Sequence, residues 1–317
     1  MAHSDTVKRV GKRAVGRAGG PTPGKVGVVV GGGSGHLPAF IGYVGKGGAD
    51  AAPVGNIFAS PPAKPVLEAT LAADGGAGVL YSYGNYAGDV MNFDRAAAQA
   101  GEQGVPVETV LVTDDVASAP KEETHRRRGI AGDFFVFKAA AAKAETMADL
   151  AAVKAAAVKA NDNTRTMGVA LSACTVPANG KPTFTLPDGE LEVGLGIHGE
   201  PGLRRTKVEP VDNLVEEMTG HILGDLDFRG SEVAVLVNGL GATPYEELYI
   251  MYRKLARILE AENVTLKRTF VGEYVTSLEM AGASITLLRL DDELLELIDA
   301  PAYCPMFMHN RAMLKGF

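Results

Sequence analysis

The sequence has few of the features that would place the chain in a specialised class of protein. It contains only two cysteines, Cys174 and Cys304, and their spacing matches no zinc-binding pattern. We expect two reduced thiols, because disulfides are rare in reducing compartments. The chain lacks an apolar run long enough to span a bilayer. Its first residues also lack the apolar segment of a secretory signal, so we expect a cytoplasmic protein.

Positive charge is scarce as well. Lys and Arg total 31 against 38 for Asp and Glu, which gives a net charge of −7. General nucleic-acid binding relies on a basic surface, so this balance argues against it. No internal repeat stands out. What the chain does have is 317 residues with 46% hydrophobic residues, enough for a sizeable core and for two domains.

Short apolar runs bounded by glycine predict buried strands, and longer segments between them predict helices. In the first half we expect strands at 25–30, 78–83, 107–112 and 134–137, with helices at 60–74, 90–99 and 147–160. In the second half we expect strands at 167–173, 190–195, 232–238, 264–271 and 283–289, with a helix at 244–262. The alternation in the first half is typical of an α/β layer with a largely parallel sheet.

We place a domain boundary near residue 164. The prediction is an N-terminal α/β domain over 1–164, which carries glycine-rich loops, and a C-terminal α/β domain over 165–317. Each domain should consist of a sheet flanked by helices.

The first glycine-rich loop runs from Gly31 to His36 and follows a predicted strand. A Walker A loop would need lysine after the last glycine, and a dinucleotide fingerprint or a nucleophile elbow would need glycine where His36 stands. Two interpretations remain. The glycines could bring backbone N–H groups close to a small polar ligand, with His36 bonding to a hydroxyl group. Alternatively, the loop is only a tight turn that His36 caps.

The second loop, from Gly84 to Asp89, also lies between a predicted strand and a predicted helix. Asp89 stands where an N-cap belongs, and a capping carboxylate would have a lowered pKa. The alternative is a general base, because ligands of α/β sheets bind at the carboxyl ends of the strands.

The third loop, Gly194 to Gly202, holds His198 between glycines, with Glu200 two residues further on. The glycines would leave the ring open to a ligand. Glu200 could fix the ring tautomer, and a neutral imidazole is a nucleophile. Together the three loops predict a small polyhydroxylated ligand.

Seven short motifs, distributed over nearly the whole chain, resemble those of the substrate-binding K subunit of dihydroxyacetone kinases. They lie at 31–36, 58–61, 85–93, 173–177, 194–202, 238–244 and 299–301. The resemblance implies two α/β domains, a homodimer and a kinase that acts on a short ketose.

The resemblance also implies roles for individual residues. His198 would bond covalently to the carbonyl carbon of the substrate as a hemiaminal, which selects ketoses over polyols such as glycerol. Asp89 would act as base on the hydroxyl that is phosphorylated, and His36 would contact ligand hydroxyls and assist transfer. The expected substrate-binding residues are Gly32, Gly33, Ser34, Gly35, Gly84 and Asn85.

In this family the nucleotide belongs to an L subunit or L domain, which carries ATP or ADP with Mg. We therefore expect this chain to bind neither nucleotide nor metal itself, and to need an L partner. The basic stretch 125–128 is either a solvated loop or a contact with that partner. A non-enzymatic ketose-sensing co-regulator is the alternative function, although a sensor would not need the base.

Three positions depart from dihydroxyacetone-specific relatives. Leu37, Phe40 and Gly84 stand where those relatives usually have glutamate, histidine and lysine. The glycine removes a side chain and should open space for one more hydroxymethyl group. The predicted substrate is therefore dihydroxyacetone or a four-carbon ketose such as erythrulose.

Overall fold

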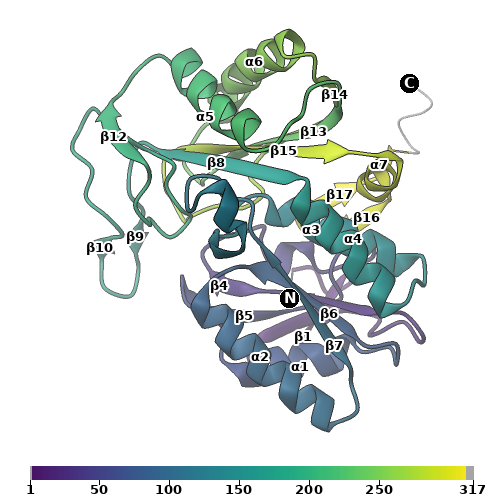
Figure 1. The fold of residues 1–317 in the computed structure, drawn as a ribbon. Helices are drawn as coiled ribbons and strands as arrows, with labels where there is room; N and C mark the ends of the chain where they lie inside the picture. The colour runs from purple at the N-terminus through teal and green to yellow at the C-terminus, as the bar shows by residue number, and fades with distance from the viewer. Residues whose placement is uncertain (1, 312–317) are drawn as a thin grey trace.

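The computed structural model describes residues 2–311, which form two sheets with helices between them and on both outer faces (Figure 1). Helices α1 (Ala63–Ala73) and α2 (Ala87–Glu102) cover the outer face of the first sheet. The helices between the sheets are α3 (Asp133–Glu145), α4 (Leu150–Asp162) and α7 (Asp292–Asp299). The outer face of the second sheet carries α5 (Val211–Asp225) and α6 (Tyr245–Ala261). Within residues 2–311, the helices are too short or too polar to cross a membrane.

The first sheet has the strand order β1-β2-β5-β3-β6-β7, with β4 paired to β5. Its strands are β1 (Val7–Val10), β2 (Ala14–Arg17), β3 (Gly27–Val30), β4 (Gly32–Ser34), β5 (Ala51–Ile57), β6 (Val79–Gly84) and β7 (Val107–Val112). The pairs among β3, β5, β6 and β7 are parallel, as predicted. Parallel strands bring their carboxyl ends to one edge, so the loops after β3 and β6 lie at the same edge.

The second sheet has the order β12-β11-β8-β15-β13-β14, and only its β13–β14 pair is parallel. Its strands are β8 (Thr164–Ala170), β11 (Glu190–Val193), β12 (Arg204–Lys207), β13 (Glu232–Gly239), β14 (Thr265–Gly272) and β15 (Gly282–Leu290). Short hairpins are formed by β9 (Thr175–Val176) with β10 (Lys181–Pro182), and by β16 (Ala302–Cys304) with β17 (Phe307–His309). Two 3-10 helices, η1 (Ile41–Tyr43) and η2 (Lys121–Arg126), lie in loops.

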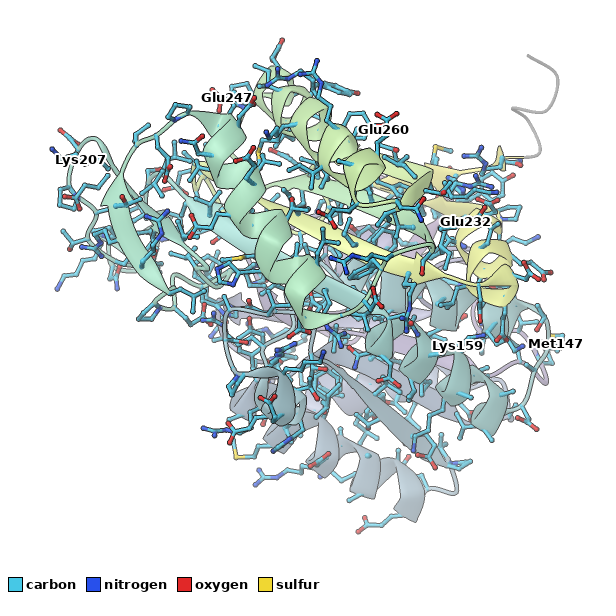
Figure 2. The ribbon with its side chains drawn as sticks, turned by 45° about the horizontal axis from the view of Figure 1, so that its top comes forward. Met147, Lys159, Lys207, Glu232, Glu247 and Glu260 are labelled. Atoms are coloured by element: carbon cyan, nitrogen blue, oxygen red, sulfur yellow. The ribbon has the colours of Figure 1, made fainter. Side chains whose placement is uncertain are left out.

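Helix α6 shows how an amphipathic sequence covers this sheet. Leu248, Met251 and Leu255 are buried at helical spacing. Glu247 and Glu260, at the two ends of the helix, are exposed to solvent (Figure 2). The charged face therefore points away from the sheet that the leucines cover.

The predicted strand at 134–137 is wrong, because these residues form the first turn of α3. Nearly every side chain of α3 is buried, since the helix packs between the two sheets. The ring of Phe134 lies 5.2 Å from that of Phe270 on β14 and 5.1 Å from that of Phe307 on β17. A short apolar run buried on all sides cannot be assigned to strand or helix by periodicity.

The other predicted strands and helices are present within a few residues of their predicted ends. The sequence did not lead us to expect the β1–β2 hairpin, β4, β5, α5 or α7. Cys174 and Cys304 are free and buried. β8 begins at the predicted domain boundary, yet one hydrophobic cluster takes residues from both halves of the chain. The division into two domains stays a prediction.

The segment between β14 and β15 is fixed by a buried amide, Asn238 at the end of β13. Its Oδ1 accepts hydrogen bonds from the N–H groups of Tyr274 (2.8 Å) and Val275 (2.9 Å). Its Nδ2 donates to the carbonyl of Val275 at 2.8 Å. Asn238 is fully buried, so water cannot replace these bonds. The amide thus shapes the chain immediately before Thr276, which contacts the site described below.

We predict that Asn238→Ala lowers the free energy of unfolding by roughly 3 kcal/mol, because buried backbone groups lose their partners at about 1–3 kcal/mol each. Urea denaturation measures the change. The matched control is Asn213→Ala on the exposed surface of α5, which should change stability by less than about 0.5 kcal/mol. Equal midpoints for the two variants would contradict this account of Asn238.

Candidate active site

Two histidines that are 162 residues apart in sequence meet where the two sheets adjoin. His36 follows β4 of the first sheet, and His198 lies in the loop between β11 and β12 of the second. Their Nε2 atoms are 3.1 Å apart, and the rings meet edge to face at a centroid distance of 4.8 Å. Two of the three predicted catalytic residues are therefore in direct contact.

His36 is held from the second-sheet side of the site. Its Nδ1 donates to the carbonyl of Thr276 at 2.7 Å, and its backbone carbonyl accepts from the N–H of Thr276 at 3.3 Å. The next turn is held in the same way, since the N–H of Leu278 donates to the carbonyl of Gly35 at 2.8 Å. The ring is 1% exposed, and burial together with the nearby His198 lowers the pKa of His36 to about 3. The ring is therefore neutral, with Nε2 as an acceptor.

His198 is oriented by Glu200. Nδ1 of His198 lies 2.8 Å from Oε1 of the carboxylate, and the backbone N–H of His198 donates to Oε2 at 2.9 Å. Burial alone would raise the pKa of Glu200, but the hydrogen bonds and charge of His198 outweigh it and lower that pKa to about 2. The carboxylate is ionised and acts only as an acceptor, so Nδ1 of His198 carries a proton. The expectation that Glu200 fixes the tautomer agrees with this geometry.

The anchors at Nδ1 decide which nitrogen of each histidine ring carries the proton. Both Nδ1 atoms are donors, because a carbonyl oxygen and a carboxylate can only accept. If both rings were neutral, two lone pairs would face each other at 3.1 Å. A polar ligand group placed between the two Nε2 atoms would therefore meet both lone pairs.

Aromatic rings surround the histidine pair. Phe58 stacks on His36 at a centroid distance of 5.0 Å and meets His198 edge to face at 5.3 Å. Tyr86 meets His198 edge to face at 4.7 Å, and its hydroxyl donates to the carbonyl of Gly129. Phe58 has a backbone φ of +51°, a region rare for bulky residues that costs roughly 1–3 kcal/mol. Residues in such conformations cluster at functional sites.

Asp89 is not the N-cap of α2, contrary to one of the two interpretations. Tyr86 occupies the cap position and Asp89 is the third helical residue. The Asp89 side chain is 9% exposed, and its Oδ1 is buried without a hydrogen-bond partner. Burial raises the pKa of Asp89 to about 6, although a hydrogen bond with Ser60 and the nearby His198 lower it. The expected lowered pKa is therefore wrong, and the group is a better base than a capping aspartate would be.

The predicted glycine loop forms β4 and the turn that leads to His36. A Cβ added at Gly32 would lie 2.4 Å from the ring of Phe40, and one at Gly33 would lie 2.7 Å from the backbone of Ala59. Gly35 has a φ of +109°, which requires glycine. The Ser34 hydroxyl donates to the carbonyl of Gly55 at 2.7 Å. The glycines thus let the aromatic residues approach the backbone beneath His36.

Gly84 and Asn85 hold the loop at 125–129 against the site. The amide of Asn85 donates to the carbonyls of His125 (3.0 Å) and Arg127 (2.8 Å). A Cβ added at Gly84 would lie 3.0 Å from both the carbonyl oxygen of Gly129 and the Tyr86 ring. The space beside Gly84 is therefore already occupied, so the expected room for a larger sugar is absent at this Cβ position.

The basic stretch 125–128 is not simply a solvated loop. Arg127 is 1% exposed and forms a two-point ion pair with Asp225, and Arg128 pairs with the buried Asp115. His125 and Arg126 remain exposed, so only they could meet a partner. Three adjacent arginines gave no sequence signal that Arg127 is buried and that the Arg128 side chain is only 15% exposed.

Sequence reasoning missed several groups around the histidines. Phe58, Ser60 and Tyr86 lay inside the quoted motifs, and a search for aromatic or hydroxyl groups there could have found them. Thr276 acts through its backbone carbonyl, which no sequence pattern reveals. Leu37 at the loop end is 46% exposed. In the described part of the chain, acidic, histidine and cysteine side chains form no group of three that could hold a metal ion.

Comparison with known proteins identifies the family of the chain. Residues 1–306 match the model of the Dak1 domain. The chain is 54% identical over 284 residues to the dihydroxyacetone-binding subunit of a PTS-dependent dihydroxyacetone kinase 2 from Listeria innocua, covering 89% of this chain and 85% of that protein. It is 47% identical to an L-erythrulose kinase from Pectobacterium atrosepticum (96% of this chain) and 49% identical to a D-erythrulose kinase from Mycolicibacterium smegmatis (92% of this chain). It spans only 52% and 50% of the lengths of these two kinases.

Solved structures give the same result. A dihydroxyacetone kinase operon co-activator superposes with a TM-score of 0.90 at 30% identity, covering 96% of this chain and 95% of that one. The dihydroxyacetone kinase of C. freundii superposes with a TM-score of 0.86 at 34% identity, covering 96% of this chain and 56% of that one. The family match over most of the sequence and these identities lead to one conclusion: the chain belongs to the Dak1-domain family, which includes the dihydroxyacetone-binding subunits of dihydroxyacetone kinases.

Proposed function

We propose that this chain is the substrate-binding subunit of a short-chain ketose kinase. It holds dihydroxyacetone or a tetrulose such as erythrulose as a hemiaminal on His198 and presents a terminal hydroxyl to Asp89. A nucleotide-bearing L subunit or domain supplies the phosphoryl group, and the chain works as a homodimer. The observation that carries the proposal is the contact between the Nε2 atoms of His36 and His198, with both Nδ1 atoms anchored.

The covalent step uses the lone pair on Nε2 of His198. It attacks the ketose carbonyl carbon, and the electrons of the C=O π bond move to oxygen. That oxygen takes a proton from solvent and becomes a hydroxyl, which donates a hydrogen bond to the neutral His36 at Nε2. The His198 ring is left positive, and the Glu200 carboxylate at 2.8 Å from Nδ1 stabilises this charge. Charge and atoms balance, because one proton moves and no group leaves.

Phosphoryl transfer would then need a base beside a terminal hydroxyl. Asp89 lies close enough to His198 for their charges to interact, and its Oδ1 lacks a partner. The carboxylate accepts the hydroxyl proton as the oxygen attacks the γ-phosphorus of the donor nucleotide, whose bond to the bridging oxygen breaks so that the nucleoside diphosphate leaves with the electron pair. The covalent bond to His198 fixes the sugar during this step, which removes much of the entropic cost of alignment.

The choice between dihydroxyacetone and a tetrulose depends on side chains at the end of the first glycine-rich loop. Relatives of this chain carry names of both dihydroxyacetone-binding subunits and erythrulose kinases, so both sugars stand as candidates. The exposed Leu37 and the buried Phe40, which meets the His36 ring at 6.3 Å, are better placed to select the sugar than Gly84.

The co-regulator function is supported by the similarity to an operon co-activator at 30% identity. Higher identities to kinases and kinase subunits, at 41–54% over similar lengths, favour the enzyme. The raised pKa of Asp89, to about 6, also favours it, because a protein that only senses ketose needs no base.

We predict that His198→Ala abolishes the preference for ketose over glycerol, because only the imidazole can bond to a carbonyl carbon. Isothermal titration calorimetry with dihydroxyacetone and with glycerol measures this preference. The control is His221→Ala, an exposed histidine on α5, which should bind as the wild type does. The covalent proposal fails if His198→Ala binds the ketose with unchanged affinity and still rejects glycerol.

We predict that Asp89→Asn binds ketose but loses nearly all phosphoryl transfer, by about 100-fold or more, because general bases contribute 10²–10⁴-fold. The assay supplies an L subunit and ATP and follows ketose phosphate. Asp94→Asn, an exposed residue of the same helix, is the matched control. Normal turnover by Asp89→Asn would leave Asp89 as a packing residue.

The pH dependence of transfer should follow the titration of Asp89. Its pKa is about 6 and the base is the carboxylate, so turnover should be constant above this pH and fall about tenfold per unit below it. The hydrogen bond with Ser60 lowers this pKa, so Ser60→Ala should move the midpoint to higher pH. Profiles of kcat for wild type and variant test both statements. A midpoint that is the same in the two proteins would assign the acid limb to another group.

A further inference from the structure

We infer that Arg128 is a positioning residue, which holds the loop of His198 in the place where its imidazole can react. The inference rests on the proposed function, because it concerns the same covalent step. It also gives a role to a residue of the basic stretch 125–128 whose side chain points inward to Asp115.

Arg128 joins the two halves of the site. Its Nε and Nη2 contact Oδ2 of Asp115 at 2.9 and 2.8 Å, and Nη2 also donates to the carbonyl of Gly194 at 3.3 Å. Asp115 is fully buried and is itself fixed, since its Oδ1 accepts the N–H of Ala117. The guanidinium thus links the loop after β7 to the first residue of the His198 loop.

Gly196 shows how closely Arg128 approaches the reactive residues. A Cβ added there would lie 2.7 Å from Nη1 of Arg128 and 2.3 Å from Oε2 of Glu200. The same Oε2 accepts the backbone N–H of His198. The guanidinium therefore packs against the backbone of the loop on the side where Glu200 orients the histidine.

The His198 loop has few other anchors. Ser277 donates from its hydroxyl to the carbonyl of Ile197 at 2.5 Å, and the N–H of Gly194 donates to the carbonyl of Gly168 at 2.7 Å. Both partners belong to the second half of the chain. Arg128 is a side-chain anchor from the first half, where His36 and Asp89 also lie. This cross-link helps to fix His198 relative to these two residues, together with the segment 276–278, which holds both His36 and Ile197.

The test uses dihydroxyacetone labelled with ¹³C at the carbonyl carbon and follows by NMR the appearance of a protein-bound tetrahedral carbon bonded to nitrogen, which the hydrate of the free sugar does not give. Arg128→Ala should slow adduct formation about 100-fold, the scale of loss for a misplacement of about 1 Å. Arg128→Lys keeps the charge but not the fork that reaches two acceptors, so its rate should fall between Arg128→Ala and wild type. Guanidinium ion, added well below denaturing concentrations, should restore part of the rate to Arg128→Ala.

Two controls separate positioning from general stability. Arg126→Ala removes an exposed arginine of the same stretch and should react as wild type does. Arg165→Lys weakens a buried ion pair with Asp225, so it should lower the melting temperature without changing the rate of the folded protein. A rate loss in Arg165→Lys equal to that in Arg128→Lys would overturn the inference, because stability alone would then explain the effect.

The outcomes separate this inference from the proposed function. If wild type forms no protein-bound tetrahedral carbon bonded to nitrogen, the proposed covalent function is wrong. If wild type forms the adduct and Arg128→Ala forms it at the same rate, the function stands and the role of Arg128 is overturned. Gly196→Ala provides a second route if Arg128→Ala does not fold. It should also slow the adduct, because Glu200 or Arg128 must move to make room.

Discussion

The site depends on one constraint, which is that each imidazole of the histidine pair is fixed at Nδ1 so that the two Nε2 atoms face each other. Thr276 supplies a backbone carbonyl to His36, and Glu200 supplies a carboxylate to His198. Either ring could rotate without its anchor, and the two Nε2 atoms would no longer face each other. The pair is therefore a product of both sheets, because neither half of the chain holds both histidines.

The rest of the local structure serves this alignment. Glycines in β4 admit Phe40 and Phe58 close to the backbone, and the rings bury His36. Burial keeps that ring neutral at ordinary pH and also raises the pKa of Asp89 to about 6. Burial thus prepares His36 as a hydrogen-bond acceptor and Asp89 as a base. For His36 the energetic cost of burial is offset by the hydrogen bond from Nδ1 to the carbonyl of Thr276, whereas Oδ1 of Asp89 is buried without a partner.

Much of the fold could be predicted from the sequence, because most strands are short apolar runs bounded by glycine. The errors have physical reasons. Residues 134–137 are helical because α3 is buried by both sheets, which removes the polar face that marks a helix. Asp89 lies three positions beyond the capping position because Tyr86 begins the helix without a side-chain cap.

The site could be predicted in part. His36, Asp89 and His198 stood out because glycines and strand ends surround them, and the structure brings the two histidines together. What a sequence cannot give is a partner that acts through its backbone, such as Thr276. It also cannot show that Arg128 points inward to Asp115 while Arg126, two residues earlier, points to solvent.

The central claim is a bond between Nε2 of His198 and the carbonyl carbon of a ketose. The most direct measurement is NMR on protein labelled with ¹⁵N at histidine and titrated with dihydroxyacetone labelled with ¹³C at the carbonyl. The account predicts a one-bond ¹³C–¹⁵N coupling at a single imidazole nitrogen, lost in His198→Ala. A bound ketose that keeps a free or hydrated carbonyl carbon without this coupling would contradict the account.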